Sequence, residues 1–221
     1  MRHRGCLITF EGLDGSGKTT QIKRLYESLK ELGFAVVRTD EPYGTPIGCD
    51  IANLTVRVPY INMDPICELL LFEAARCENV RQNILPAIRN GEIIICDRFI
   101  DSTVAYQAYG RSIPLSTVNF INNTVIHEAF PDITVYIDID PELSKNRVID
   151  RYRLNKTKKD KFELLGKDFF EKVHQGYSDI IKDDPNRFII VDGTKDIDTI
   201  ASEILNEVLN RLSKTIVQKV E

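Results

Sequence analysis

Apolar runs along the chain alternate with longer segments in which apolar and polar residues recur at helical spacing. The runs are four to six residues long and nearly continuous. This pattern is typical of strands that are buried on both faces of a parallel sheet. We expect five such strands, at residues 6–10, 35–38, 92–97, 133–138 and 187–191.

The segments between the runs have the spacing of amphipathic helices, with apolar residues three and four positions apart. The first places Ile22, Leu25 and Leu29 on one face and ends at Gly33, a residue type that commonly terminates helices. We expect helices at residues 20–32, 64–90 with a break near residue 83, 102–108, 115–130, 142–155, 167–182 and 197–212.

Strands that alternate with helices predict an α/β fold in three layers, a five-stranded parallel sheet with helices on both faces. We expect one domain, residues 1–214, followed by a C-terminal tail at residues 215–221. Ligands of such sheets bind beyond the carboxyl ends of the strands. Four segments therefore fall along one rim, namely residues 12–19, 41–42, 97–98 and 138.

Composition excludes several classes of protein. The chain has 221 residues, 43% of them hydrophobic and 28% charged, as in an ordinary soluble domain. Its net charge of −4 argues against broad nucleic-acid binding, and no run of 18 apolar residues exists that could span a membrane. The start of the chain leaves no room for a signal peptide. Its five cysteines and three histidines show no zinc-ligand spacing. We expect a cytoplasmic protein with reduced thiols.

A glycine-rich turn between the first strand and the first helix fits the phosphate-loop pattern Gly12-x-x-x-x-Gly17-Lys18-Thr19. Glycines let backbone N–H groups wrap around phosphate oxygens, and the following helix adds its positive end. Lys18 would bridge the outer phosphates, and the Thr19 hydroxyl would hold Mg²⁺. A chance match arises on the order of once in a hundred chains of this length. The pattern therefore predicts a phosphate-loop NTPase fold that binds a nucleoside triphosphate through Gly12, Leu13, Asp14, Gly15, Ser16, Gly17, Lys18, Thr19 and Thr20.

Asp97 and Arg98 follow the third apolar run directly. An acid at this place suits the Mg²⁺ shell of a phosphate-loop enzyme, although strand ends also use aspartate as a turn former. A guanidinium in the cleft beside it suits bidentate binding of a phosphate, the alternative being a surface salt bridge. We favour the Mg²⁺ and phosphate roles.

Two further groups of residues share a helix face. Phe72 and Arg76 are four positions apart and could hold the flat base and the phosphate of a nucleotide, although a core phenylalanine and a solvated arginine are favoured by spacing alone. Thr103 and Tyr106 present polar groups toward the same cleft. Ser102 either joins them or caps the helix.

Eight lysines and arginines lie between residues 145 and 161, in a chain that is acidic overall. Such a run is usually a solvated face. In a phosphoryl-transfer enzyme it can instead form a lid that excludes water and neutralises the transferred group. We interpret residues 147–163 as a lid.

Together these segments resemble the thymidylate kinases. The resemblance is carried by the phosphate loop and by residues 41–48, 69–76, 97–111, 131–138, 160–163 and 176–177. It implies transfer of the ATP γ-phosphate to dTMP, giving ADP and dTDP for dTTP synthesis, with Mg²⁺ as the metal and a homodimer as the assembly. Another nucleotide kinase and a phosphate-loop switch are the alternatives. The guanine-reading Asn-Lys-x-Asp of many switches is absent.

The resemblance also implies individual roles. Asp14 would engage the 3′-hydroxyl of dTMP, and Tyr106 would exclude ribonucleotides by crowding the 2′ position. Arg76 and Arg98 would grip the acceptor phosphate, and Arg147 would lie against adenine. The dTMP site would comprise Asp14, Glu41, Pro42, Phe72 stacked on thymine, Arg76, Arg98, Ser102, Thr103 against the base, Tyr106 and Gln107.

The catalytic arginine of this family lies either in the phosphate loop or in the lid. The loop interior here is Leu-Asp-Gly-Ser, with no arginine, so the chain resembles the bacterial lid-arginine type. Arg153 or Arg151 would then stabilise the transferred group, with Lys18, Arg98 and Asp14 completing the catalytic set. The chain departs from the family pattern at Asp40, Tyr43, Ala75 and Lys161.

Overall fold

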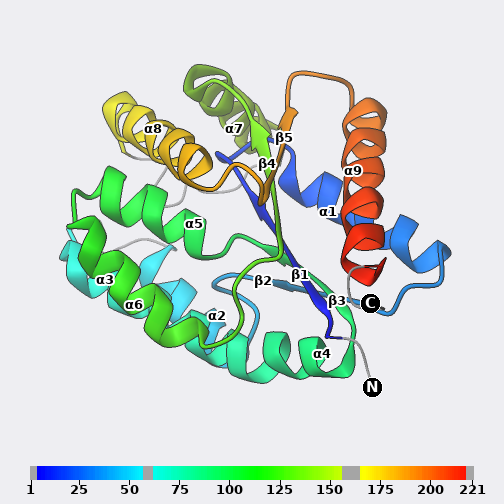
Figure 1. Ribbon diagram of the computed structural model, residues 1–221. Coiled ribbons are helices and arrows are strands. Elements are labelled where there is room, and N and C mark those ends of the chain that lie inside the picture. Colours follow the sequence, from blue (N-terminus) through cyan, green and yellow to red (C-terminus); the bar gives the residue numbers. More distant parts are fainter. Residues whose placement is uncertain (1–3, 57–61, 156–164, 218–221) are drawn as a thin grey trace.

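The sheet at the centre of the molecule has five parallel strands in the order β2-β3-β1-β4-β5 (Figure 1). The computed structural model describes residues 4–56, 62–155 and 165–217. The predicted α/β class and parallel sheet are confirmed, with strand ends displaced by at most two residues. The strands are β1 (Cys6–Glu11), β2 (Val36–Asp40), β3 (Ile93–Asp97), β4 (Ile133–Asp138) and β5 (Phe188–Asp192).

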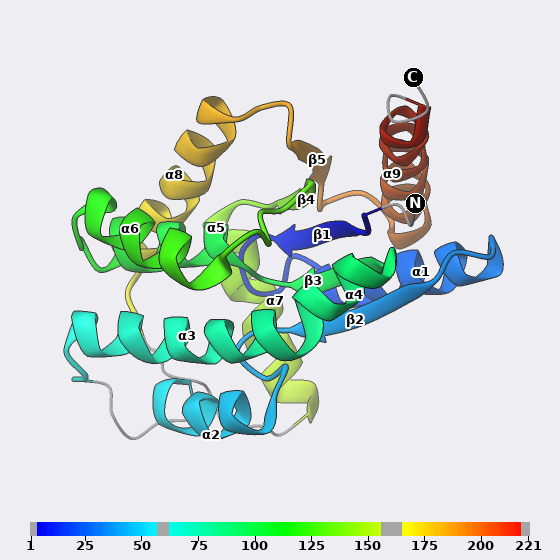
Figure 2. The same ribbon diagram turned by 60° about the horizontal axis from the view of Figure 1, so that its bottom comes forward.

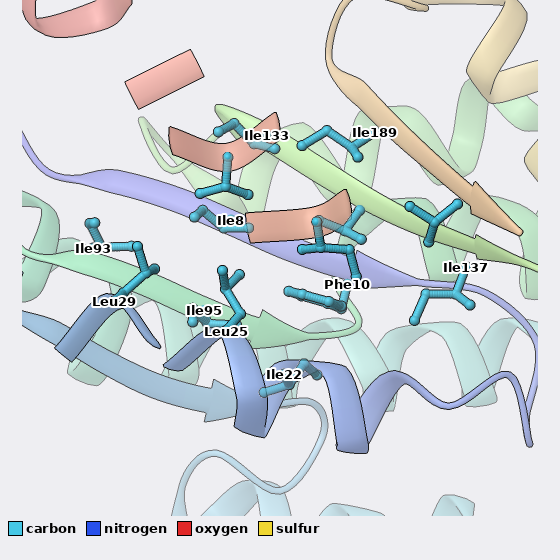
Figure 3. Close-up of a cluster of buried hydrophobic side chains, with 14 of the residues drawn as sticks. Ile8, Phe10, Ile22, Leu25, Leu29, Ile93, Ile95, Ile133, Ile137 and Ile189 are labelled. Atoms are coloured by element: carbon cyan, nitrogen blue, oxygen red, sulfur yellow. The ribbon is translucent and has the colours of Figure 1, made fainter. Parts of the chain in front are cut away.

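One face of the sheet is covered by α1 (Lys18–Glu31) and α9 (Ile197–Val217). Figure 3 shows Ile22, Leu25 and Leu29 of α1 extending toward isoleucines of the sheet. Alternate strand residues point to opposite faces, so Ile8 contacts this cluster whereas Leu7 contacts the cluster on the other face. Both faces are buried, which explains why the strands are continuous apolar runs.

The opposite face is covered by a longer series of helices, seen side-on in Figure 2. The π-helix η1 continues α3 into α4, and η2 continues α5. The short α2 packs against α3. These elements are α2 (Pro46–Thr55), α3 (Pro65–Asn79), η1 (Val80–Ile84), α4 (Leu85–Asn90), α5 (Ile100–Thr103), η2 (Val104–Gly110) and α6 (Leu115–Ile126).

Several boundaries differ from the expected ones. Helix α2 was not among the expected helices, although Thr45 caps it by accepting a hydrogen bond from the Gly48 N–H at 3.0 Å, and Pro46 begins it. The expected break near residue 83 is a π-helix, so the chain stays helical there. Helix α6 ends at Ile126 rather than at residue 130. Helix α9 continues to Val217, into the segment expected to be tail.

The carboxyl ends of the strands form the expected rim. Asp97 of β3 lies beside Asp40 of β2 on one side and Phe10 of β1 on the other. Helices α7 (Pro141–Asn155) and α8 (Lys167–Asp183) follow β4 beyond this edge (Figure 1). The first part of the predicted lid is the end of α7. Its lysines at positions 156, 158, 159 and 161 lie outside the described residues.

Among the helices that the structure describes, none is long and apolar enough to cross a membrane.

Candidate active site

The phosphate loop joins β1 to α1 and depends on its glycines. Gly12, Gly15 and Gly17 have φ values of 135°, 75° and 102°, which side chains rarely allow. A Cβ on Gly12 would lie 2.6 Å from the Ile137 carbonyl oxygen, so the loop also presses against β4. A Cβ on Gly17 would meet nothing within 4 Å. The loop is therefore a preformed cradle with open space at the start of α1.

Lys18 lies buried across this cradle. Its Nζ donates to the carbonyl oxygens of Gly12 at 3.0 Å and Leu13 at 2.9 Å. Burial and the nearby Arg98 lower the pKa of Lys18 to about 8, against the opposing effect of Asp14 and Asp97. The Ser16 hydroxyl is buried and has no hydrogen-bond partner among the described residues. A bound anion would further stabilise the charged form of Lys18 and give this hydroxyl an acceptor, so the cradle fits the phosphates of ATP.

Thr19 and Asp97 face each other at the end of β3, with the Thr19 hydroxyl 3.4 Å from Asp97 Oδ2. Asp40 adjoins Asp97 in the sheet, and burial together with Asp97 raises the pKa of the Asp40 carboxyl. The described residues contain no group of three or more histidine, cysteine, aspartate or glutamate side chains placed to bind a metal. Two oxygen donors beside a phosphate cradle fit Mg²⁺, which takes its other ligands from phosphates and water.

A cavity of about 200 Å³ opens beside the phosphate loop. All of the residues expected to bind dTMP line it, although they come from β1–α1, β2–α2, α3 and the β3–η2 segment. Tyr43 and Val56 line it too and were missed by sequence reasoning. Tyr43 follows the expected Glu41-Pro42 pair directly, which is the signal that could have included it. The cavity is lined by Asp14, Glu41, Pro42, Tyr43, Val56, Phe72, Arg76, Arg98, Ser102, Thr103, Tyr106 and Gln107.

Arg98 lies between this cavity and the phosphate loop. Its Nη2 donates to Asp14 Oδ1 at 2.7 Å, and its Nη1 donates to the Ser102 hydroxyl at 3.0 Å. The side chain is 20% exposed. Although burial of Asp14 opposes the effect, the charges of Arg98, Lys18 and Arg151 lower the pKa of Asp14. A guanidinium held by one carboxylate and by hydroxyls keeps most of its positive field, as a phosphate-binding group requires.

Arg76 occupies the floor of the cavity and is only 4% exposed. Its Nε donates to Glu41 at 2.8 Å, and its Nη1 donates to Glu73 and to the Thr103 hydroxyl at 2.7 Å. Two carboxylates thus compensate one guanidinium, and sequence reasoning missed Glu73. This geometry does not favour the phosphate grip expected for Arg76. It favours a residue that orders the floor of the cavity.

Known proteins are similar in sequence to this chain over nearly its full length. The family model described as thymidylate kinase matches residues 10–204. A thymidylate kinase from an Exiguobacterium species is 38% identical over 215 residues, covering 97% of this chain and 99% of its own. One from Pelobacter propionicus is 40% identical over 213 residues, covering 96% and 97%. The chain belongs to the thymidylate kinase family.

The structural comparison agrees with the sequence. The crystal structure of thymidylate kinase from Ehrlichia chaffeensis matches with a TM-score of 0.73 and 35% identity, covering 93% of this chain and 99% of that one. Thymidylate kinases are phosphotransferases that phosphorylate dTMP with ATP as the donor, and their fold is that of the phosphate-loop NTPases. The resemblance in the sequence motifs is thereby confirmed.

Three arginines of the predicted lid of this thymidylate kinase family member lie on α7. Arg147 donates to the carbonyl oxygens of Gly193 at 3.0 Å and Gly15 at 3.4 Å, bridging the phosphate loop and the turn after β5. Arg151, one turn later, acts electrostatically on Asp14. Arg153 pairs with Asp150 at 3.4 Å and is 76% exposed. The electrostatic effect on Asp14 favours Arg151 over Arg153 as the catalytic arginine of the predicted lid.

The departures from the thymidylate kinase pattern fall in different surroundings. Ala75 is a completely buried residue of α3 and does not line the cavity. Tyr43 lines the cavity, and Asp40 lies beside the Thr19 and Asp97 pair. Lys161 is outside the described residues.

Proposed function

We propose that this chain transfers the γ-phosphate of ATP to dTMP, giving ADP and dTDP for dTTP synthesis. The observation that carries the proposal is the single cavity into which every residue expected to bind dTMP converges, next to the phosphate loop. Asp14 belongs to both, since it lies in the loop and lines the cavity. Donor and acceptor sites that share one residue suit direct transfer between two bound nucleotides.

The base would be read by Phe72 and Thr103. Phe72 offers its ring to the thymine, and the Thr103 hydroxyl donates to Glu73 at 3.2 Å while accepting from Arg76 at 2.7 Å. With its hydrogen committed to Glu73, this hydroxyl has only lone pairs left for a ligand. Thymine N3 carries a hydrogen and can donate to it, whereas cytosine N3 cannot. Arg76 and Glu73 thus act through Thr103, and Gln107 adds a further polar group at the base.

The acceptor sugar and phosphate would lie at the mouth of the cavity. The Arg98 guanidinium would donate two N–H hydrogen bonds to the phosphate and would give up part of its contact with Asp14. Asp14 is then available to the 3′-hydroxyl, and Tyr106 fills the space at the 2′ position. Ser102, Glu41 and Pro42 complete the wall.

The donor phosphates would bind in the loop, where backbone N–H groups and Lys18 hold them. Mg²⁺ held by Thr19 and Asp97 would neutralise charge on the phosphates of ATP. Arg147, fixed between Gly15 and Gly193, would flank the adenine. The preformed cradle and the buried Ser16 hydroxyl support this placement.

The function is tested with a coupled ADP-release assay that offers ATP, Mg²⁺ and a panel of monophosphates. We expect turnover with dTMP, much less with dCMP because its N3 cannot donate to Thr103, and none in Lys18→Ala. A circular dichroism spectrum checks that Lys18→Ala is folded. Turnover with dAMP, dGMP or dCMP but not dTMP would contradict the proposal.

The lid arginine is tested with a matched pair of variants. Because Arg151 acts on Asp14 whereas Arg153 pairs with Asp150, Arg151→Ala should lower kcat by about 100-fold and Arg153→Ala by less than twofold. KM for dTMP should change little in both, since the contact is made with the transferred group. The reverse order would assign the role to Arg153.

We also propose a cytoplasmic homodimer. Helices α3 and α6 pack side by side and carry exposed apolar side chains, among them Leu70 at 51% and Phe120 at 72% exposure. None of the five cysteines, all of which lie in the described part of the chain, forms a disulfide, as in reduced proteins. Analytical ultracentrifugation tests the assembly, and Leu70→Glu with Phe120→Glu should shift a dimer to the monomer. A monomeric wild-type chain at micromolar concentration would overturn it.

A further inference from the structure

Glu11 is a buried carboxylate for which the proposed reaction has no part. It is the last residue of β1, one position before Gly12, and its exposed fraction is 0%. Leu7 points to the face of the sheet that α5 covers, so the strand alternation directs Glu11 to that face also. An unpaired carboxylate costs several kcal/mol in such a place, so its partners reveal what it does.

Four hydrogen bonds from three residues converge on this carboxylate. Oε1 accepts from the backbone N–H groups of Phe99 at 2.8 Å and Ser102 at 3.3 Å. Oε2 accepts from the Ser102 hydroxyl at 2.6 Å and the Tyr177 hydroxyl at 2.9 Å. These partners come from the β3–α5 turn, from α5 and from α8, so Glu11 ties β1 to both helices.

The same two hydroxyls also contact Arg98. Its Nη1 lies 3.0 Å from the Ser102 hydroxyl and 3.5 Å from the Tyr177 hydroxyl. A hydroxyl has one hydrogen to donate, and a guanidinium can only donate. Both hydroxyls must therefore accept from Arg98. Ser102 then donates to Glu11, and Tyr177 donates either to Glu11 directly or to the Ser102 hydroxyl, which lies 3.0 Å from it. Each is a one-way bridge from the positive side chain to the negative one.

The backbone at Arg98 depends on the same carboxylate. Arg98 has a φ of 64°, a left-handed conformation that costs a non-glycine residue free energy. The bond from Phe99 N–H to Glu11 and the bond from Arg98 N–H to the Phe10 carbonyl at 2.9 Å hold this turn against β1. Glu11 thus fixes both the backbone from which the arginine projects and the hydroxyls against which it rests.

The charges of the two groups depend on each other. Burial and the nearby Asp101 raise the pKa of Glu11 to about 7, and Arg98 opposes that shift. The Glu11 carboxylate in turn favours the charged form of Arg98. Glu11 does not line the cavity, so it influences the charge of Arg98 without itself contacting a ligand there.

We propose that Glu11 is the positioning residue for Arg98, acting through the hydroxyls of Ser102 and Tyr177 to aim the guanidinium at the acceptor phosphate. The proposal rests on the proposed function, in which Arg98 binds that phosphate. A purely structural role, as the cap of α5, would predict lower stability with no preference among ligands.

The test compares two ligands that differ only in the phosphate. In Glu11→Gln the shape is kept and the acceptor charge is lost, so dTMP should bind about tenfold more weakly by calorimetry, as expected for one charge-assisted hydrogen bond. Thymidine, which lacks the phosphate, should bind as it does to the wild type. Val208→Ala, which opens a cavity beneath α9, is the control for lost stability and should change neither affinity.

A double-mutant cycle separates this inference from the proposed function. If Arg98→Ala does not weaken dTMP relative to thymidine, the phosphate role of Arg98 is wrong. If it does, then adding Glu11→Gln to Arg98→Ala should weaken dTMP less than twofold further. Equal weakening of both ligands by Glu11→Gln, or full additivity in the cycle, would overturn the positioning role.

Tyr177→Phe carries the test if Glu11→Gln does not fold. It removes one bridging hydroxyl, together with its 3.0 Å contact to Ser102, and leaves the carboxylate, the Ser102 bridge and the ring in place. We expect a two- to threefold loss of dTMP affinity with unchanged thymidine affinity. No loss for dTMP would count against the bridge.

Discussion

Two arginines at opposite ends of one cavity have opposite surroundings. Arg76 on the floor is 4% exposed and contacts two glutamates, whereas Arg98 at the mouth is 20% exposed and contacts one aspartate together with hydroxyls. The sequence motifs suggested the same role for both, a grip on the acceptor phosphate. Their different partners favour different roles for the two arginines.

The difference lies in how much positive charge remains for a ligand. Two glutamates compensate the guanidinium at the floor, so that corner is a hydrogen-bonded support for Thr103. At the mouth, Asp14 can exchange its contact with Arg98 for a contact with a ligand, and the hydroxyls carry no charge that would cancel that of Arg98. The number of carboxylates around an arginine is thus a better guide to its role than the spacing that placed it.

Replacing Arg98 should produce the largest effect. Arg98→Ala removes the fork at the phosphate, so kcat/KM for dTMP should fall about 1,000-fold while KM for ATP stays within threefold. The ADP-release assay with dTMP varied measures this. Arg98→Lys should recover only part of the loss, because an ammonium lacks the fork. A fall below tenfold would remove the distinction between the two corners.

Replacing Arg76 should act on stability instead. Arg76→Met leaves Glu41 and Glu73 without their counter-charge, so the free energy of unfolding should fall by about 3–5 kcal/mol. Urea denaturation followed by circular dichroism measures it. Adding Glu41→Gln and Glu73→Gln should restore part of the loss, because no charge then lies buried without a partner. A loss below about 1 kcal/mol would show that the floor is not a charge network.

The pH dependence of stability should show the smallest effect, with opposite signs at the two corners. Burial raises the pKa of Glu41 from 4.5 to about 7, so the folded protein holds an extra proton in that range. The Glu41 contribution to stability therefore falls as the pH rises from about 4.5 to 7. In Glu41→Gln the change in the free energy of unfolding across that pH range should be smaller than in the wild type by about 1–3 kcal/mol.

Asp14 provides the comparison, since its pKa is lowered by Arg98, Lys18 and Arg151 despite burial. Its contribution is present above its ordinary pKa of 3.8 and is lost only as the pH falls through the lowered value. Asp14→Asn should therefore leave the slope between pH 5 and 7 as in the wild type. A flattened slope in Asp14→Asn, or an unchanged one in Glu41→Gln, would contradict the assigned environments.

Local sequence patterns were sufficient for most of the fold. Continuous apolar runs identified the five strands because both faces of the sheet are covered. The phosphate loop was recognisable because the positive φ angles of its closely spaced positions require glycine. Helix α2 was missed although Thr45 and Pro46 mark its start. The π-helices η1 and η2 were not predictable, since they depend on how the helical layer packs rather than on residue spacing.

The site divides in the same way. The sequence by itself determined which residues end the strands on one rim. The segments that resemble the family predicted most of the side chains that line the cavity. Only the tertiary structure decided what each of them contacts. Glu11 and Tyr177 are 166 positions apart, and Arg76 and Glu41 are 35 apart. Charge compensation and burial arise between such distant segments, so the roles of Arg76, Arg98 and Glu11 follow from the folded neighbourhood and not from spacing.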